Sequence, residues 1–248
     1  MGRLLRANFA RLWKTTAFWG CIISPAALGL LMQMLEGRGS GYFRSMYNAS
    51  PLGLIFSVVF AMRYIGTDNS DKTIRNKLMI GISRVKIYFA NLITVSAGMV
   101  LIFAGSWAAP VVYDLLNGGY SDMEPQNLAL YAALCFIAGV AMMAVCTLLA
   151  TLVTSRSLAT ALSIALTIGM FFATQHLYSF STSWIAEMVF NSLPTSQIRD
   201  IEIRVSFMNR YPETHGVWYV LKPMWYSLGA GAVVTVIGAL AFRRKDIK

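Results

Sequence analysis

The sequence predicts an all-α, polytopic membrane protein with six transmembrane helices, and three observations support this fold class. Of the 248 residues, 56% are hydrophobic and only 13% are charged, whereas soluble domains carry roughly 25% charged residues. The apolar residues form six near-continuous runs of roughly 18 to 27 residues, long enough to cross a hydrocarbon layer of about 30 Å. The basic residues gather at the edges of these runs. Only helices or closed barrels satisfy the backbone in lipid, and runs of this length fit helices.

The elements follow from the order of these runs. In residues 1–16, Leu5, Phe9, Leu12 and Trp13 recur at helical spacing opposite basic residues, which predicts an amphipathic elbow helix on the membrane surface. A charged flank that only sets topology is the alternative. The first apolar run is too long for a secretory signal and lacks a typical cleavage site, so we expect an uncleaved span. The predicted spans cover residues 17–35, 49–66, 87–113, 128–154, 158–178 and 224–242 of a single transmembrane domain, 1–248.

The basic residues predict the orientation of the spans. If the N-terminus is inside, 15 of the 21 Lys and Arg residues lie on the cytoplasmic side. The positive-inside rule therefore places both termini in the cytoplasm of a multi-pass protein, for which we expect a bacterial cell membrane. Two connections are too long for simple turns: the cytoplasmic loop 67–86 and the external segment 179–222.

Several function classes find no support. The formal charge of +10 comes from the edges of the spans and not from a basic patch with exposed aromatics, so no nucleic acid partner is predicted. The three cysteines lie inside apolar runs, and neither an H-E-x-x-H motif nor a G-x-x-x-x-G-K-[ST] phosphate loop occurs. We therefore predict no catalytic residues, no metal site and no cofactor in this chain. An ATP-independent secondary carrier remains an alternative, although no acidic residue is predicted in mid-membrane.

The loop 67–86 predicts a short helix. Asp68 or Ser70 can cap its start, Ile74 and Leu78 lie four residues apart on one face, and Gly81 is placed to end it. A helix this short is marginal alone in water, so it needs a surface. That surface is either the bilayer, which attracts its basic residues, or a cytoplasmic partner protein.

The same loop carries a family resemblance. Residues 65–88, IGTDNSDKTIRNKLMIGISRVKIY, resemble the loop after the second span in permease subunits of ATP-binding-cassette exporters of the ABC-2 type, a six-helix family with the type V exporter fold. In that family the loop is the coupling helix, which docks on a separate ATPase subunit. The resemblance implies that the ATPase-coupling residues are Thr73, Ile74, Arg75, Asn76, Lys77, Leu78, Gly81, Ser83 and Arg84.

The resemblance also implies the partners. Two copies of a separate ATPase subunit would bind ATP and Mg. A second permease subunit, either the same chain in a homodimer or a related subunit, would meet this one through spans one and five. On span five, small residues repeat at every fourth position and allow close packing of another helix, with lipid contact as the alternative: Ala161, Ala165 and Gly169. Membrane lipid is the remaining expected partner.

The external segment predicts short re-entrant or outer helices before the last span. Such helices help form the outer gate in the exporters that this chain resembles, and the corresponding residues here are Trp184, Ile185, Met188, Val189, Phe190 and Pro194. Residues 198–210 form a more polar insertion, which we expect to be a small outer cap. The expected function is outward transport of amphipathic or hydrophobic cargo, with a peptide favoured, such as an antimicrobial or cytolytic peptide.

Overall fold

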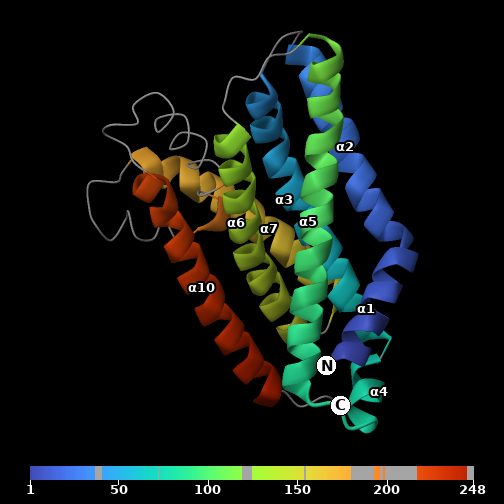
Figure 1. Ribbon diagram of the computed structural model, residues 1–248. Coiled ribbons are helices and arrows are strands. Elements are labelled where there is room, and N and C mark those ends of the chain that lie inside the picture. Colours follow the sequence, from blue (N-terminus) through green and yellow to red (C-terminus); the bar gives the residue numbers. More distant parts are fainter. Residues whose placement is uncertain are drawn as a thin grey trace.

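The computed structural model describes residues 1–36, 41–71, 73–118, 125–153, 155–179, 193–195, 198 and 217–244. Its helices, labelled in Figure 1, are α1 (Gly2–Lys14), α2 (Thr16–Glu36), α3 (Tyr42–Ser70), α4 (Thr73–Met79), α5 (Arg84–Leu116), α6 (Pro125–Leu152), α7 (Arg156–Ser179) and α10 (Val217–Arg244). Within the described ranges, six helices are long and apolar enough to cross a membrane. The predicted all-α fold with six spans is therefore confirmed.

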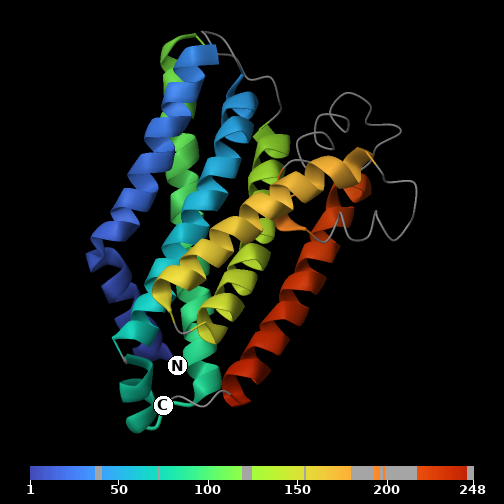
Figure 2. The ribbon, with the colours of Figure 1, turned by 180° about the vertical axis from the view of Figure 1, so that it is seen from behind.

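Helices α3 and α5 form the centre of the bundle. They pack against each other, α2 lies against both, and α6 covers another side of the pair. In the most apolar 18-residue stretch of α3, 67% is buried inside the bundle, compared with 17% for the corresponding stretch of α10. Figure 2 shows α7 running obliquely across the back of the bundle, where it packs on α3 and α6. Helix α10 packs mainly on α6 and leaves most of its surface for lipid.

A hydrogen-bonded aromatic group fills the interior between α3, α5 and α6. The indole Nε1 of Trp107 donates to the hydroxyl of Ser50 at 3.0 Å, and the Ser50 and Tyr131 hydroxyls lie 2.9 Å apart. The Phe103 and Trp107 rings meet edge to face with centroids 5.5 Å apart. Because no water is available in the bilayer core, these bonds let polar side chains lie within the spans without unsatisfied groups.

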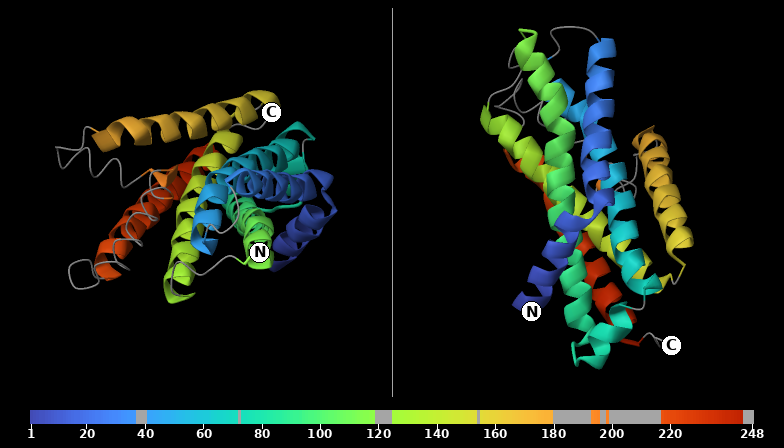
Figure 3. Two further views of the ribbon diagram at one scale, coloured as in Figure 1. Left: turned by 90° about the horizontal axis from the view of Figure 1, so that it is seen from above. Right: turned by 90° about the vertical axis from the view of Figure 1, so that its right-hand side faces the viewer.

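Both ends of the described chain lie at one end of the bundle, together with α4 (Figures 1 and 3). We call this the α4 end. Here α3 continues through Ser70 and α5 begins at Arg84, so both helices extend past the predicted apolar runs. The expectation that Asp68 or Ser70 caps the short helix is wrong, because both residues belong to α3. A helix can continue past the end of an apolar run, because its backbone hydrogen bonds do not depend on apolar side chains. Here the polar side chains beyond the run also find partners.

Candidate functional site

The short helix predicted in loop 67–86 is α4, Thr73–Met79. It ends in two backbone bonds: the Gly81 N–H donates to the Leu78 carbonyl at 2.9 Å, and the Ile82 N–H donates to the Lys77 carbonyl at 3.2 Å. This pattern closes a helix when the residue after it adopts a left-handed conformation, as Gly81 does with φ +86°. Gly81 therefore ends the helix as predicted. The chain then enters α5 from Ser83, whose extended backbone occupies the N-cap position.

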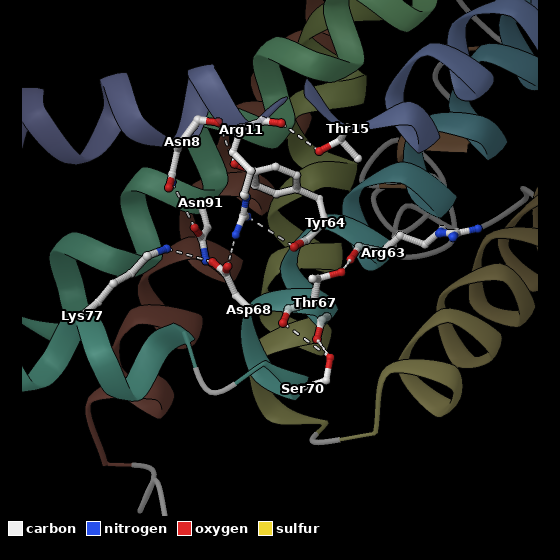
Figure 4. Close-up of polar contacts among 11 residues, drawn as sticks. Asn8, Arg11, Thr15, Arg63, Tyr64, Thr67, Asp68, Ser70, Lys77 and Asn91 are labelled. Carbon is white, nitrogen blue, oxygen red and sulfur yellow. Dashed lines mark hydrogen bonds and ion pairs between the residues drawn. The ribbon is translucent and has the colours of Figure 1, made fainter. Parts of the chain in front are cut away.

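A buried carboxylate holds α4 against the bundle. Asp68 of α3 is 0% exposed and forms ion pairs with Arg11 of α1 and with Lys77 of α4, the latter at 3.0 Å between Nζ and Oδ2 (Figure 4). The side chains of Arg11 and Lys77 are 32% and 14% exposed. One carboxylate thus joins α1, α3 and α4.

Further contacts extend this arrangement to α5. The Arg11 guanidinium lies 4.0 Å from the centre of the Tyr64 ring. The Tyr64 hydroxyl donates to the Asn8 carbonyl at 2.9 Å, and the Asn8 amide donates to Oδ1 of Asn91 at 3.3 Å. Burial lowers the pKa of Arg11, but the hydrogen bond and the attraction to Asp68 together raise it above its usual value. The residues of this network, drawn in Figure 4, are called the Asp68 cluster: Asn8, Arg11, Tyr64, Asp68, Lys77 and Asn91.

An apolar cluster holds the other side of α4. Ile74, with 3% of its surface exposed, packs with Tyr88 of α5 and Phe242 of α10. The members of this Ile74 cluster are Ile74, Ile87, Tyr88 and Phe242, with Leu4, Leu78, Ile82, Leu92 and Ala239 around them. In addition, the Arg84 guanidinium donates to the Arg243 carbonyl at 3.2 Å, at the end of α10. Helix α4 is thereby connected to the last span as well as to α3.

The nine residues predicted for ATPase coupling divide between two faces of this structure. Ile74, Lys77 and Leu78 point into the bundle. Those that are exposed are Arg75, Asn76, Gly81 and Ser83, whereas Thr73 and Arg84 are half-buried. Two exposed apolar side chains beside Gly81 were not predicted from the sequence: Met79, 71% exposed, and Ile80, 79% exposed. Their position outside the Ile74–Leu78 register is the signal that could have identified them.

The predicted packing residues of span five lie on an exposed face of α7. Ala161, Ala165 and Gly169 are all exposed, and no described atom lies within 4 Å of the position that a Cβ on Gly169 would take. This face is therefore free to accept another helix or lipid.

Most of the predicted outer gate lies outside the described residues: Trp184, Ile185, Met188, Val189 and Phe190. The insertion 198–210 does too, apart from Ile198, which is 1% exposed within the core. Pro194 is described and buried. Next to it, the hydroxyls of Thr195 and Thr174 lie 3.3 Å apart, so this part of the segment packs against α7.

The opposite end of the bundle contains a second buried carboxylate. Asp114 of α5 is 0% exposed, accepts a hydrogen bond from the Gln33 amide at 2.8 Å and accepts another from the Ser45 hydroxyl. These bonds join α5 to α2 and α3. From the sequence, Asp114 falls just beyond the predicted third span, whereas the structure places it within α5.

An apolar groove of about 650 Å³ lies between α2 and α5. Its lining is Ile22, Ile23, Ala26, Ala27, Leu30, Met34, Gly105, Ala108, Ala109, Val112, Tyr113 and Leu116. The alanine and glycine residues in this lining are too small to fill the space between the two helices. This groove can hold a hydrophobic chain but offers few polar partners.

A sequence model of a family described as ABC-2 family transporter protein matches residues 7–174. The match covers more than half of the 248-residue chain and contains α4 and all of the Asp68 cluster. A search of curated proteins found no match.

Proposed function

The chain belongs to the ABC-2 family of transporter proteins, and from this premise we propose that it is the permease subunit of an ATP-binding-cassette exporter in which α4 docks on a separate ATPase subunit. Family membership makes the chain a membrane component of an ABC transporter. The ATPase subunit supplies the energy, since the sequence contains no P-loop. In this proposal the α4 end faces the cytoplasm.

The two faces of α4 carry the docking proposal. One face is fixed to the bundle through Asp68 and Ile74. The other exposes Arg75 and Asn76, and the tip of the loop exposes Met79 and Ile80. A fixed helix with an exposed apolar tip and polar groups around it suits a small protein–protein contact. We therefore assign the tip, rather than the Ile74–Leu78 pair, as the apolar anchor for the ATPase subunit.

The contacts of α4 also support a role in transmitting motion. A displacement of α4 acts on α1 and α3 through the ion pairs of Asp68, and on α5 and α10 through the Ile74 cluster. Densely packed contacts transmit displacement because they deform little. A push at α4 would thus reach helices near both ends of the sequence.

The cargo and the assembly are the finer parts of the proposal. The cargo is amphipathic or hydrophobic, with a peptide favoured, because the groove between α2 and α5 is apolar. Two permease subunits form a homodimer, and the small residues Ala161, Ala165 and Gly169 offer α7 as one packing surface. Outward transport follows from the exporter family that the loop resembles.

Copurification tests the docking proposal. The chain is expressed with candidate ABC ATPase subunits from the same organism and purified through a tag on the chain. The retained ATPase is then measured. Ile80→Asp places a charge in the proposed contact and is expected to reduce retention roughly tenfold or more. Leu35→Asp is the matched control: Leu35 is 79% exposed, as Ile80 is, but lies at the opposite end of the bundle, near the end of α2.

Two outcomes would overturn the proposal: no ATPase copurifies with the unaltered chain, or Ile80→Asp retains as much ATPase as Leu35→Asp. The cargo is tested separately by ATP hydrolysis of the reconstituted complex with and without peptides. Stimulation by a peptide is expected, and its absence for every peptide tested would reject peptide cargo.

A further inference from the structure

A small cavity lies at the α4 end, where α1 turns into α2 beside α3. It measures about 80 Å³ and is lined by Arg11, Thr15, Ala17, Phe60, Arg63, Tyr64 and Thr67. Its volume is about half that of a cavity of roughly 150 Å³ that holds a benzene molecule. The cavity therefore has room for a group of a few heavy atoms and not for a whole lipid or a peptide.

Arg63 is the unusual member of this lining. It belongs to a membrane-spanning helix, about 7 to 8 Å along the axis from Asp68. Its side chain is exposed, and within the described part of the chain it forms no hydrogen bond or ion pair. At the edge of the hydrocarbon region, the exposed guanidinium of Arg63 is open to a ligand from outside the chain, either water or an anion.

The surrounding charges favour an anion. The cavity and the Asp68 cluster together contain three cations, Arg11, Arg63 and Lys77, but only one carboxylate, that of Asp68. Asp68 pairs with both Arg11 and Lys77, and the set still carries a net charge of +2. The site therefore attracts anions.

Aromatic residues place the cavity at the level of the lipid head groups. Trp13 and Trp19 are 49% and 44% exposed, and the Trp19 indole donates to the Trp13 carbonyl at 3.0 Å. Phe18, beside them, contacts Phe60 of the cavity wall with ring centroids 5.2 Å apart. Exposed tryptophans of this kind favour the interface between hydrocarbon and water.

We propose that this cavity binds the phosphate group of an anionic phospholipid of the cytoplasmic leaflet, with Arg63 as its principal ligand. The leaflet assignment rests on the proposed function, which places the α4 end in the cytoplasm. Arg11 contributes the guanidinium N–H groups that do not bond Asp68 or Tyr64. The Thr15 and Thr67 hydroxyls already donate to the Arg11 and Arg63 carbonyls. They shape the walls rather than donate to the phosphate.

A lipid is favoured over free phosphate because the cavity opens beside two spans. The acyl chains of a bound lipid would lie on the apolar surfaces of α2 and α3 and add hydrophobic contact. Inorganic phosphate gains no such contact. The lipid is therefore expected to bind more tightly than inorganic phosphate.

Native mass spectrometry of the purified full chain in neutral detergent tests this site. Titration with phosphatidylglycerol is expected to show one lipid per chain that binds more tightly than phosphatidylcholine. Arg63→Gln is expected to weaken this binding roughly fivefold, the effect of one basic residue near an anionic surface. Ala17→Leu keeps every charge but fills the cavity, and the same loss is expected. Arg6→Gln, an exposed arginine of α1 outside the cavity, serves as the matched control.

Each alternative result has a clear meaning. Equal losses in Arg63→Gln and Arg6→Gln, with none in Ala17→Leu, would show general charge attraction and overturn the site. Displacement of the lipid by an equal concentration of inorganic phosphate would make free phosphate the ligand. Thermal melting of each variant verifies that it is folded.

The lipid site and the exporter proposal can fail separately. If the unaltered chain retains its ATPase subunit while all lipid affinities are equal, the lipid site fails and the exporter proposal stands. If no ATPase copurifies, the exporter proposal fails whatever the lipid result.

Discussion

Replacing Asp68 by asparagine removes the negative charge that joins α1, α3 and α4. Exposed ion pairs contribute roughly 0 to 1 kcal/mol, whereas removing one partner of a fully buried pair costs roughly 3 to 5 kcal/mol. The carboxylate is 0% exposed, but its partners Arg11 and Lys77 keep 32% and 14% exposure and so retain some water. We therefore expect Asp68→Asn to lower the free energy of unfolding by about 2 to 3 kcal/mol, between the two limits.

The assay is reversible unfolding by sodium dodecyl sulfate in mixed micelles, followed by circular dichroism. Lys77→Met is introduced into the unaltered chain and into the Asp68→Asn chain, which forms a double-mutant cycle. Because Lys77 bonds the chain through Asp68, its loss is expected to cost about 1 kcal/mol or more in the first background and close to nothing in the second.

Two results would refute this account of Asp68. An equal cost of Lys77→Met in both backgrounds would show that Lys77 does not act through Asp68. A cost of Asp68→Asn below about 1 kcal/mol would show that the pairs behave as surface pairs.

The pH dependence of stability gives a further check on Asp68 and Arg11. The pKa of Arg11 is higher in the folded state than in the unfolded state. Its contribution to the free energy of unfolding is therefore fully present below the unfolded-state pKa, and it is lost only as the pH rises through the higher folded-state pKa. Titration of Arg11 therefore adds no pH dependence in the neutral range.

The remaining predictions concern glycines and one buried hydroxyl, and the same unfolding assay checks them. Gly238→Ala is expected to lower the free energy of unfolding by about 1 to 3 kcal/mol, because the new Cβ would lie 2.7 Å from Cζ of Tyr88. Gly229→Ala is the control, since no described atom lies within 4 Å of its new Cβ. Equal effects of the two changes would contradict the packing argument. Tyr88→Phe is expected to stabilise by about 1 kcal/mol, because the buried hydroxyl has no described partner; a loss of stability would reveal one. Gly81→Ala is expected to cost about 1 to 2 kcal/mol through its φ of +86°, whereas a helical glycine with equally open surroundings, Gly20, is expected to gain from the same change.

The sequence was sufficient for the spans and for α4, because both depend on local patterns. Apolar runs define the six spans, and the spacing of Ile74 and Leu78 before Gly81 predicts a short helix with one apolar face. Periodicity does not say what covers that face. Tyr88 and Phe242 cover it, and Phe242 is far away in the sequence. For this reason the sequence could not distinguish a face for the bundle from a face for a partner.

The Asp68 cluster was beyond prediction for a similar reason. Hydropathy ends the second run at Gly66 and makes Asp68 look like a loop residue. The helix continues because Asp68 finds Arg11, which lies 57 positions earlier in the chain, and Lys77 of α4. A single sequence does not show which distant cation meets which acid. Met79 and Ile80 were missed because exposure, unlike apolarity, depends on the packed neighbours.

The two buried carboxylates show how the charge asymmetry of the sequence is expressed in three dimensions. At the α4 end, Asp68 bonds two cations, and Arg63 stands nearby. At the opposite end, the described bonds of Asp114 come from the amide of Gln33 and the hydroxyl of Ser45, which are neutral donors. An acid buried where cations are abundant pairs with them, and one buried where they are scarce relies on hydrogen bonds. The basic end of a bundle faces the cytoplasm under the positive-inside rule. The contrast between Asp68 and Asp114 therefore supports the cytoplasmic placement of the α4 end, on which both proposals depend.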